Sequence, residues 1–158
     1  MSEISEAIQD KCLAFGDRVI KLNDYLLKEA ANKKSEGGSQ KADRRGNSQT
    51  SYVRHQTCRI PVHLQAIATL CNQLLRSGTS IGANNAEAIN AISKTDFRSK
   101  SYIALKEARE SLYWIELLHR NNYIDDKAYQ SIYNDCEELV KILVSRCKKL
   151  DQQINEEK

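Results

Sequence analysis

The basic side chains of this chain gather in one stretch of the sequence. Between residues 33 and 60 there are seven basic residues against two acidic ones, whereas the whole chain has a formal net charge of only +3. Lysine and arginine at this density can bind the phosphates of a nucleic acid, and Tyr52 and His55 can stack on unpaired bases. The stretch therefore indicates contact with RNA or single-stranded DNA. Its candidate phosphate ligands are Lys33, Lys34, Lys41, Arg44, Arg45, Arg54 and Arg59.

A second basic cluster lies near the end of the chain. We include its residues Arg146, Lys148 and Lys149 among the candidate nucleic-acid ligands. Charge-rich stretches are also common on surfaces that are merely solvated. Because phosphate contacts carry no sequence information, neither cluster distinguishes RNA from DNA.

Two further patterns resemble ligand-binding sites, and neither meets the requirements of one. His55, Cys58 and His63 are irregularly spaced and offer at most three metal ligands without a paired motif. The small-residue segment 77–85 lacks the Walker pattern of a phosphate loop and the strand that precedes one, so close helix packing explains it better. We therefore predict no catalytic residue, no cofactor and no metal, with a metal or redox protein as a distant alternative.

The acidic side chains in the middle of the sequence suit a structural role better than acid–base catalysis. Glu87 and Glu107 stand near basic residues of neighbouring turns, whereas a catalytic carboxylate must be held in a cleft with its partners. We predict a buried polar network between two helices that fixes their register. Its members are Arg76, Asn84, Glu87 and Glu107.

Length and composition predict a single all-α domain over residues 1–158. The chain contains only 6 Gly, 1 Pro and 2 Phe, which is unlike an all-β fold with its many turns. Five cysteines are an odd number without paired spacing, so we expect free thiols. Met1 opens onto polar residues and no apolar run reaches membrane-spanning length, so we expect a cytoplasmic protein without membrane contact.

Apolar residues recur every three or four positions in four segments, which predicts four long helices. The first runs from about residue 2 to residue 31. The second follows Pro61 and ends its apolar stripe at Ile92. Ser93 opens the third with a capping box, and Asp125 caps the fourth. Four cysteines fall on these stripes as small hydrophobic residues: Cys12, Cys71, Cys136 and Cys147.

Short connections require the second, third and fourth helices to run antiparallel, and an up-down-up-down bundle closes the fold most simply. The first and second helices are joined by the long basic loop of residues 33–60, which is too poor in apolar residues to form a core. Loops of this length are usually either functional or disordered, and both remain open. Gly78 and Asn85 on the second stripe predict close approach of a neighbouring helix.

Two apolar rows beside the main stripes suggest that the bundle assembles with copies of itself. One row lies on the first helix at Leu13, Ile20 and Leu27. The other lies on the third helix and is interrupted by polar residues, as expected of a subunit interface. Its members are Tyr102, Leu105, Arg109, Leu112 and Glu116.

The second and third helices carry a longer and more specific pattern. It consists of QLLRSGTSIGANNAEA at residues 73–88, Ser93, Asp96 and Phe97, IALKEARES at 103–111, and YWIELL at 113–118. This pattern resembles the bacterial four-helix-bundle family that includes the 23S rRNA intervening-sequence proteins and the accessory variability proteins of diversity-generating retroelements. The resemblance covers the first and fourth helices only by length and periodicity.

The resemblance implies a non-enzymatic bundle that assembles into a homopentamer. For the retroelement branch it also implies binding of RNA or cDNA and of a partner reverse transcriptase. We therefore expect a pentameric scaffold of a diversity-generating retroelement. The alternative is a structural homo-oligomer of the 23S rRNA intervening-sequence type that does not bind nucleic acid.

Overall fold

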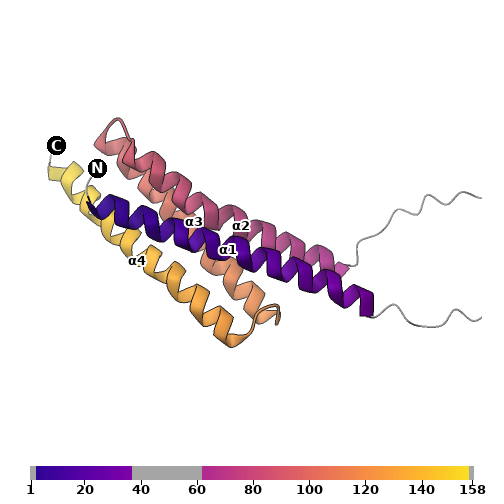
Figure 1. Ribbon diagram of the computed structural model, residues 1–158. Coiled ribbons are helices and arrows are strands. Elements are labelled where there is room, and N and C mark those ends of the chain that lie inside the picture. The colour runs from indigo at the N-terminus through magenta and orange to yellow at the C-terminus, as the bar shows by residue number, and fades with distance from the viewer. Residues whose placement is uncertain (1–2, 37–61, 157–158) are drawn as a thin grey trace, which may run out of the picture.

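Four α-helices pack in antiparallel order and confirm the predicted up-down-up-down bundle (Figure 1). The computed structural model describes residues 3–36 and 62–156, with the side chains of residues 5–32 and 64–156. Helices are the only regular elements in this described part of the chain. In chain order they are α1 (Glu3–Glu36), α2 (Val62–Ile89), α3 (Lys94–Arg120) and α4 (Asp126–Glu156).

Helix α1 is longer than its apolar stripe predicts. It continues to Glu36, so the backbone at Lys33 and Lys34 is helical and the predicted loop cannot begin at residue 33. The last turns contain leucine, lysine, glutamate and alanine, which favour a helix without any apolar periodicity. An ion pair between Lys28 and Asp24, at 2.6 Å and one turn apart, adds to this local stability.

The predicted caps of α3 and α4 are confirmed. The Ser93 hydroxyl accepts a hydrogen bond from the backbone N–H of Asp96 at 3.1 Å. The Asp125 carboxylate accepts one from the N–H of Ala128 at 2.7 Å. Each side chain satisfies a donor that the first turn of its helix would otherwise leave unpaired.

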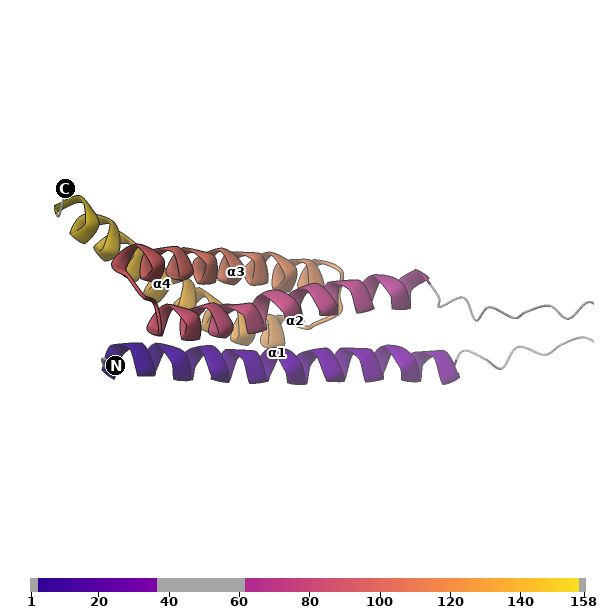
Figure 2. The same ribbon diagram turned by 90° about the horizontal axis from the view of Figure 1, so that it is seen from above.

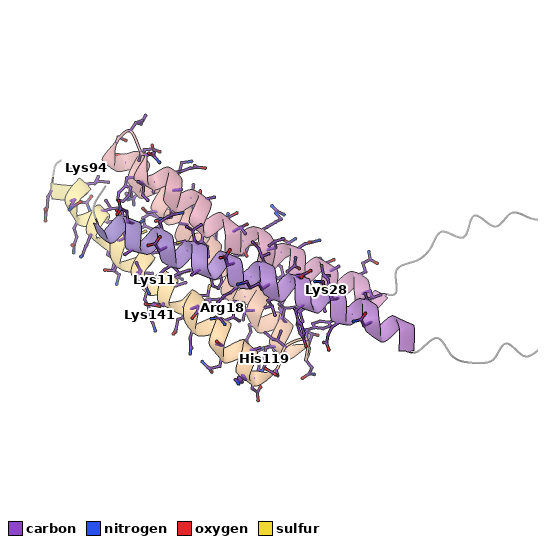
Figure 3. All side chains as sticks on the ribbon, viewed as in Figure 1. Lys11, Arg18, Lys28, Lys94, His119 and Lys141 are labelled. Atoms are coloured by element: carbon purple, nitrogen blue, oxygen red, sulfur yellow. The ribbon has the colours of Figure 1, made fainter. Side chains whose placement is uncertain are left out.

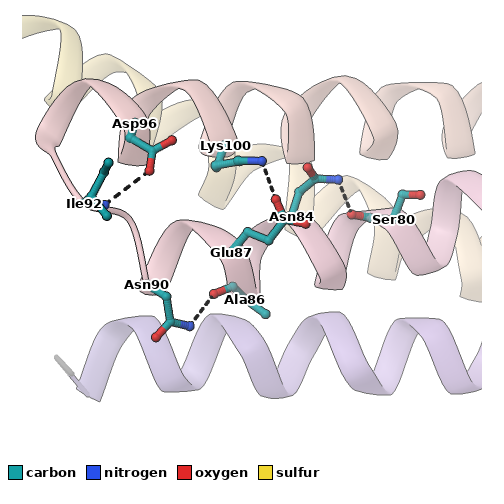
Figure 4. Close-up of polar contacts among 8 residues, drawn as sticks. All are labelled: Ser80, Asn84, Ala86, Glu87, Asn90, Ile92, Asp96 and Lys100. Atoms are coloured by element: carbon teal, nitrogen blue, oxygen red, sulfur yellow. Dashed lines mark hydrogen bonds and ion pairs between the residues drawn. The ribbon is translucent and has the colours of Figure 1, made fainter.

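The expected end of the second helix at Ile92 is wrong. Helix α2 ends at Ile89, and the Ile92 side chain is 96% exposed instead of lying on the buried stripe. The backbone N–H groups of Asn90 and Ala91 bond to carbonyls three residues back, which tightens the final turn. The Ile92 N–H then donates to the Asp96 carboxylate (Figure 4). Ile92 therefore belongs to the turn into α3 and not to the buried stripe of α2.

The apolar core runs along the whole bundle and contains side chains from every helix. The four cysteines predicted on the stripes are all buried and have free thiols. Burial raises the pKa of Cys12 and of Cys71 to about 11 and that of Cys136 to about 12, so these thiols stay protonated and act as small hydrophobic groups. The largest fully buried apolar side chains are Phe15, Leu26, Ile81, Ile115, Leu118, Leu139 and Leu143.

Helix α2 is central to the packing because it lies between α1 and α3 (Figure 2). Helix α3 in turn packs along α4, whereas α1 and α4 contact each other over a much shorter stretch. Polar pairs hold this shorter contact. Lys11 pairs with Glu138 at 2.9 Å, and Arg18 pairs with Asp135 and donates to the Ser131 hydroxyl. Figure 3 labels Lys11 and Arg18 on α1.

None of the four helices in the described ranges combines the length and the apolar character that crossing a lipid bilayer requires. Their exposed faces are instead rich in charged side chains, many of them paired within one helix (Figure 3).

Two glycines on α2 let α1 approach closely. A Cβ placed at Gly78 would lie 3.0 Å from the Val19 Cγ2, a distance that real Cβ atoms rarely accept. A Cβ at Gly82 would lie 3.4 Å from the Cys12 Cβ, in ordinary contact. The close approach predicted at Gly78 is therefore confirmed, and the neighbour is α1.

We predict that Gly78→Leu lowers the free energy of unfolding by about 1 to 3 kcal/mol, because the added side chain overpacks Val19 and Phe15. Asn72→Leu is the matched control, since Asn72 is exposed on the same helix as Gly78. That variant should be neutral or up to about 1 kcal/mol more stable through helix propensity. Urea unfolding measures both, and a Gly78→Leu protein as stable as the parent would contradict the packing.

Candidate subunit and nucleic-acid interfaces

The structure places three of the ten predicted phosphate ligands. Lys148 and Lys149 are exposed on α4, where they are free to meet an anion. Arg146 lies on the same helix and is half-buried. The side chains of Lys33, Lys34, Lys41, Arg44, Arg45, Arg54 and Arg59 lie outside the described residues, as do His55, Cys58 and His63.

Arg146 is not the exposed phosphate ligand that the sequence predicts. Its Nη1 donates to the Asn85 side-chain oxygen at 2.6 Å, and its guanidinium lies 5.4 Å from the centroid of the Phe97 ring. Burial lowers the pKa of this guanidinium below its ordinary value. The sequence could not reveal this, because the basic cluster of Arg146, Lys148 and Lys149 has the same appearance in the sequence whichever of its side chains the helix directs into the bundle.

Asn85 connects three helices at the level of Arg146. Its amide nitrogen donates to the Gln9 side-chain oxygen at 2.6 Å, while its oxygen accepts from Arg146. Gln9 lies on α1, Asn85 on α2 and Arg146 on α4, and Asn85 is fully buried. A polar residue on the apolar stripe of α2 was the available sequence signal for this connection.

In the described part of the chain, no hydrogen bond or ion pair joins the predicted network members Arg76, Asn84, Glu87 and Glu107 to one another, and Glu107 pairs with its neighbour Lys106 at 3.7 Å. Arg76 is exposed, and the Asn84 amide donates to the Ser80 carbonyl of its own helix at 2.8 Å (Figure 4). Glu87 is exposed and pairs with Lys100 of α3 (Figure 4). The helix phase explains the error, since the buried polar positions lie one residue further along, at Ser77 and Asn85.

Small side chains form the buried contact between α2 and α3. The Ser111 hydroxyl donates to the Ser77 hydroxyl at 2.9 Å, and both residues are 1% exposed or less. Ser101, Ala104 and Ala108 continue the same buried face of α3. This contact sets the register of the two helices, the role we had predicted for the charged residues.

The predicted interface row on α3 is partly internal. Leu105 is only 8% exposed and belongs to the core, and Leu112 packs partly against it. Tyr102 is more exposed, but its hydroxyl donates to Asp151 of α4 at 2.6 Å. Arg109 is the exposed cation of the row. The prediction that Leu105 is available to another subunit is therefore wrong, because Leu105 is buried next to the stripe position Ala104.

Glu116, the last residue of that row, is engaged within the bundle. It accepts hydrogen bonds from the Tyr129 hydroxyl and from Arg120, each at 2.7 Å. These bonds lower the pKa of the Glu116 carboxyl, and the Tyr129 bond raises the pKa of that phenol to about 12. The Tyr129 ring also stacks on His119 at 4.1 Å between centroids. The group therefore ties the end of α3 to the start of α4.

The row on α1 is exposed as predicted. Leu13 is 58% and Ile20 is 49% exposed, and both stand beside a shallow groove of about 300 Å³ between α1 and α2. Small residues, among them Gly16 and Ala83, form the groove. The exposed face of α1 thus has protruding apolar side chains next to a groove that is lined largely by small and apolar residues.

Metal-ligating side chains do not gather in the described part of the chain, where no group of three His, Cys, Asp or Glu residues is placed to hold an ion. What the geometry does define is an antiparallel four-helix bundle with an exposed apolar face on its first helix, a class of small helical protein. A profile of the family described as "23S rRNA-intervening sequence protein" matches residues 54–145. The chain belongs to this family.

A solved structure supports the assignment over nearly the full length. It is the crystal structure of a protein with unknown function from the S23 ribosomal protein family of Bacteroides thetaiotaomicron VPI-5482. The two chains are 36% identical with a TM-score of 0.65, and the match covers 92% of this chain and 98% of that chain. No curated protein matches. The intervening-sequence part of the predicted resemblance is thereby confirmed, and the link to retroelement accessory proteins stays a prediction.

We predict that Asn85→Ala lowers the free energy of unfolding by about 1 to 3 kcal/mol, because it leaves Gln9 and a half-buried Arg146 without their partner. Asn84→Ala is the matched control, since the Asn84 side chain bonds only within its own helix. Its effect should stay within about 0.5 kcal/mol. Equal losses in the two variants, measured by chemical unfolding, would show that Asn85 is not the connecting residue.

Proposed function

We propose that this protein is a non-enzymatic, homo-oligomeric scaffold that binds RNA or single-stranded DNA. The observation that carries the proposal is the exposed apolar row of α1 beside the α1–α2 groove. A folded monomer gains nothing from large aliphatic side chains that water surrounds, whereas burial against a second copy removes their surface from water.

The spacing of the row suits helix-to-helix packing between subunits. Leu13, Ile20 and Leu27 follow one another at intervals of seven residues, so they share one side of α1. Gly16 leaves the space between Leu13 and Ile20 open, since a Cβ at this position would meet no atom within 4 Å. A side chain from another copy fits into that space as a knob between two ridges.

The stoichiometry in the proposal is a homopentamer, and it rests on the resemblance to the intervening-sequence and retroelement proteins. A ring repeats every cation of the chain around one axis, so that weak phosphate contacts add through multivalency. Lys148 and Lys149 are the exposed candidates on the described surface. The basic residues between 41 and 59 contribute the larger share of the charge.

For the retroelement form of the proposal, a reverse transcriptase is the protein partner. A reverse-transcriptase gene with a nearby repeat in the genome supports that form. An open reading frame within a 23S rRNA gene instead favours the alternative, a structural homo-oligomer without nucleic-acid binding, and the family match gives this alternative its weight.

We predict that the purified protein has a mass of five chains by light scattering and that the double variant Leu13→Asp, Ile20→Asp dissociates. Two carboxylates in an apolar contact lose their hydration without gaining a partner, which costs far more than the contact provides. The fold should persist, because both side chains are exposed in the single chain.

Tyr25→Asp is the matched control for this experiment. Tyr25 is 58% exposed, as Leu13 is, and it lies on the same helix but on a different side. The control should keep the mass of the parent. A monomeric parent at micromolar concentration, or equal dissociation of both variants, would contradict the proposed interface.

For nucleic-acid binding we predict a strong salt dependence. Replacing Lys41, Arg44, Arg45, Arg54 and Arg59 together by glutamine should weaken binding to every oligonucleotide, and each lost phosphate contact should remove about 0.7 to 0.9 from the slope of log affinity against log salt. Base preference should hardly change. If the slope is unchanged while Lys148→Gln, Lys149→Gln flattens it, α4 carries the contacts. A parent that does not bind at low salt supports the structural alternative.

A further inference from the structure

A second hollow of the bundle differs from the α1–α2 groove in both size and charge. It has a volume of about 550 Å³ and lies where the later turns of α4 face the beginnings of α1 and α3. Its apolar wall consists of Ile8, Phe97, Ile142 and Leu150. This volume and this lining are typical of pockets that bind small molecules.

All the charged side chains that line this cavity in the described structure are basic: Lys141, Arg146 and Lys149. Glu137 pairs with Lys141 itself at 2.8 Å, so this cation of the lining is neutralised, and Asp151 pairs with Arg98 at 2.5 Å. Arg146 and Lys149 are the remaining cations of the lining. The cavity therefore keeps an excess of positive charge beside an apolar wall.

Arg146 is the cation of this lining that is most shielded from water, since Lys141 and Lys149 are exposed. Its contacts are the neutral Asn85 amide and the Phe97 ring, and it forms no ion pair with a described carboxylate. Its Nη2 is buried and has no hydrogen-bond partner among the described residues. A guanidinium that is partly removed from water is normally paired, because an unpaired charge there is costly. No described carboxylate supplies such a pair for Arg146.

We propose that this cavity binds a small organic anion with an apolar body. The anionic head lies at the basic edge between Arg146 and Lys149, where the Ser145 hydroxyl can donate a hydrogen bond, and the body fills the space against Phe97 and Ile142. Arginine and lysine both recognise a carboxylate through charge-assisted hydrogen bonds. A fatty carboxylate of medium length has this chemistry.

The same chemistry argues against a nucleic acid in this cavity. A polynucleotide presents a row of solvated phosphates, which suits an open basic surface such as that of Lys148. An apolar wall with a single cluster of cations suits one head group and one hydrocarbon chain. Lys149 is a candidate for both, so Lys148, which lies outside the cavity lining, distinguishes the nucleic-acid surface from this cavity.

Calorimetric titration of the full chain with decanoate, kept below its micelle-forming concentration, tests the proposal. We expect saturable binding of one decanoate per chain. Decanol, the uncharged match, should bind about tenfold or more weakly, because it lacks the charge-assisted hydrogen bonds. Inorganic phosphate should also bind weakly, since it has no apolar body. No decanoate binding, or equal affinity for decanoate and decanol, overturns the proposal, and so does phosphate binding as tight as that of decanoate.

Variants locate the binding on this cavity. Lys149→Gln should weaken decanoate about two- to fivefold, whereas Lys148→Gln, its exposed neighbour outside the cavity, should not change it. Ser145→Glu places a carboxylate at the basic edge and should abolish binding while the protein melts no lower than the parent. Arg146→Gln should weaken decanoate binding about 30-fold or more. If the Arg146→Gln protein unfolds, the Lys149→Gln and Ser145→Glu variants decide the question.

Two further outcomes would overturn the assignment. If the Lys148 and Lys149 variants lose decanoate affinity equally, the contact is a general attraction to the α4 surface. If a short oligonucleotide displaces decanoate from the parent, the cations belong to the nucleic-acid interface. Light scattering in parallel shows whether any variant also changes the oligomeric state, which keeps this test independent of the scaffold proposal.

Discussion

The close approach of α2 to both of its neighbours is the constraint on which the rest of the bundle depends. Towards α1 it relies on Gly78, and towards α3 on the Ser77–Ser111 hydrogen bond. At the α1 contact, the missing Gly78 side chain leaves the space that Val19 and Phe15 fill. At the α3 contact, small residues let the two backbones approach. The contact between α1 and α4 is smaller and includes the ion pairs of Lys11 and Arg18.

Polar groups inside the bundle serve its geometry in a specific way. Asn85 has a donor and an acceptor on one short side chain, and it uses both, towards Gln9 and Arg146. An apolar residue at this position would pack in several helix rotations, whereas the paired amide accepts only one. Such specificity has a cost in stability, because it keeps a guanidinium partly out of water.

Sequence periodicity predicted the fold class, the topology and both helix caps, because these depend on local propensities and on which side of each helix is apolar. The prediction failed at positions where a shift of one residue decides whether a side chain faces the core or the solvent. Leu105 and Asn84 each adjoin a buried stripe position, and a helix turns by about a quarter of a circle per residue, so the pattern could not separate inside from outside there. The contacts of Arg146 were also beyond reach, since they join residues 61 positions apart.

The four-residue connection between α2 and α3 has a consequence for how the chain folds. These two helices pack against each other more extensively than any other described pair and lie next to each other in the sequence, so their association closes only a short loop. Helix α1 must instead join α2 across residues 37–61, at a greater loss of chain entropy. We expect the α2–α3 hairpin to form first and α1 to dock onto it, so the face that carries Leu13 and Ile20 is assembled late in folding.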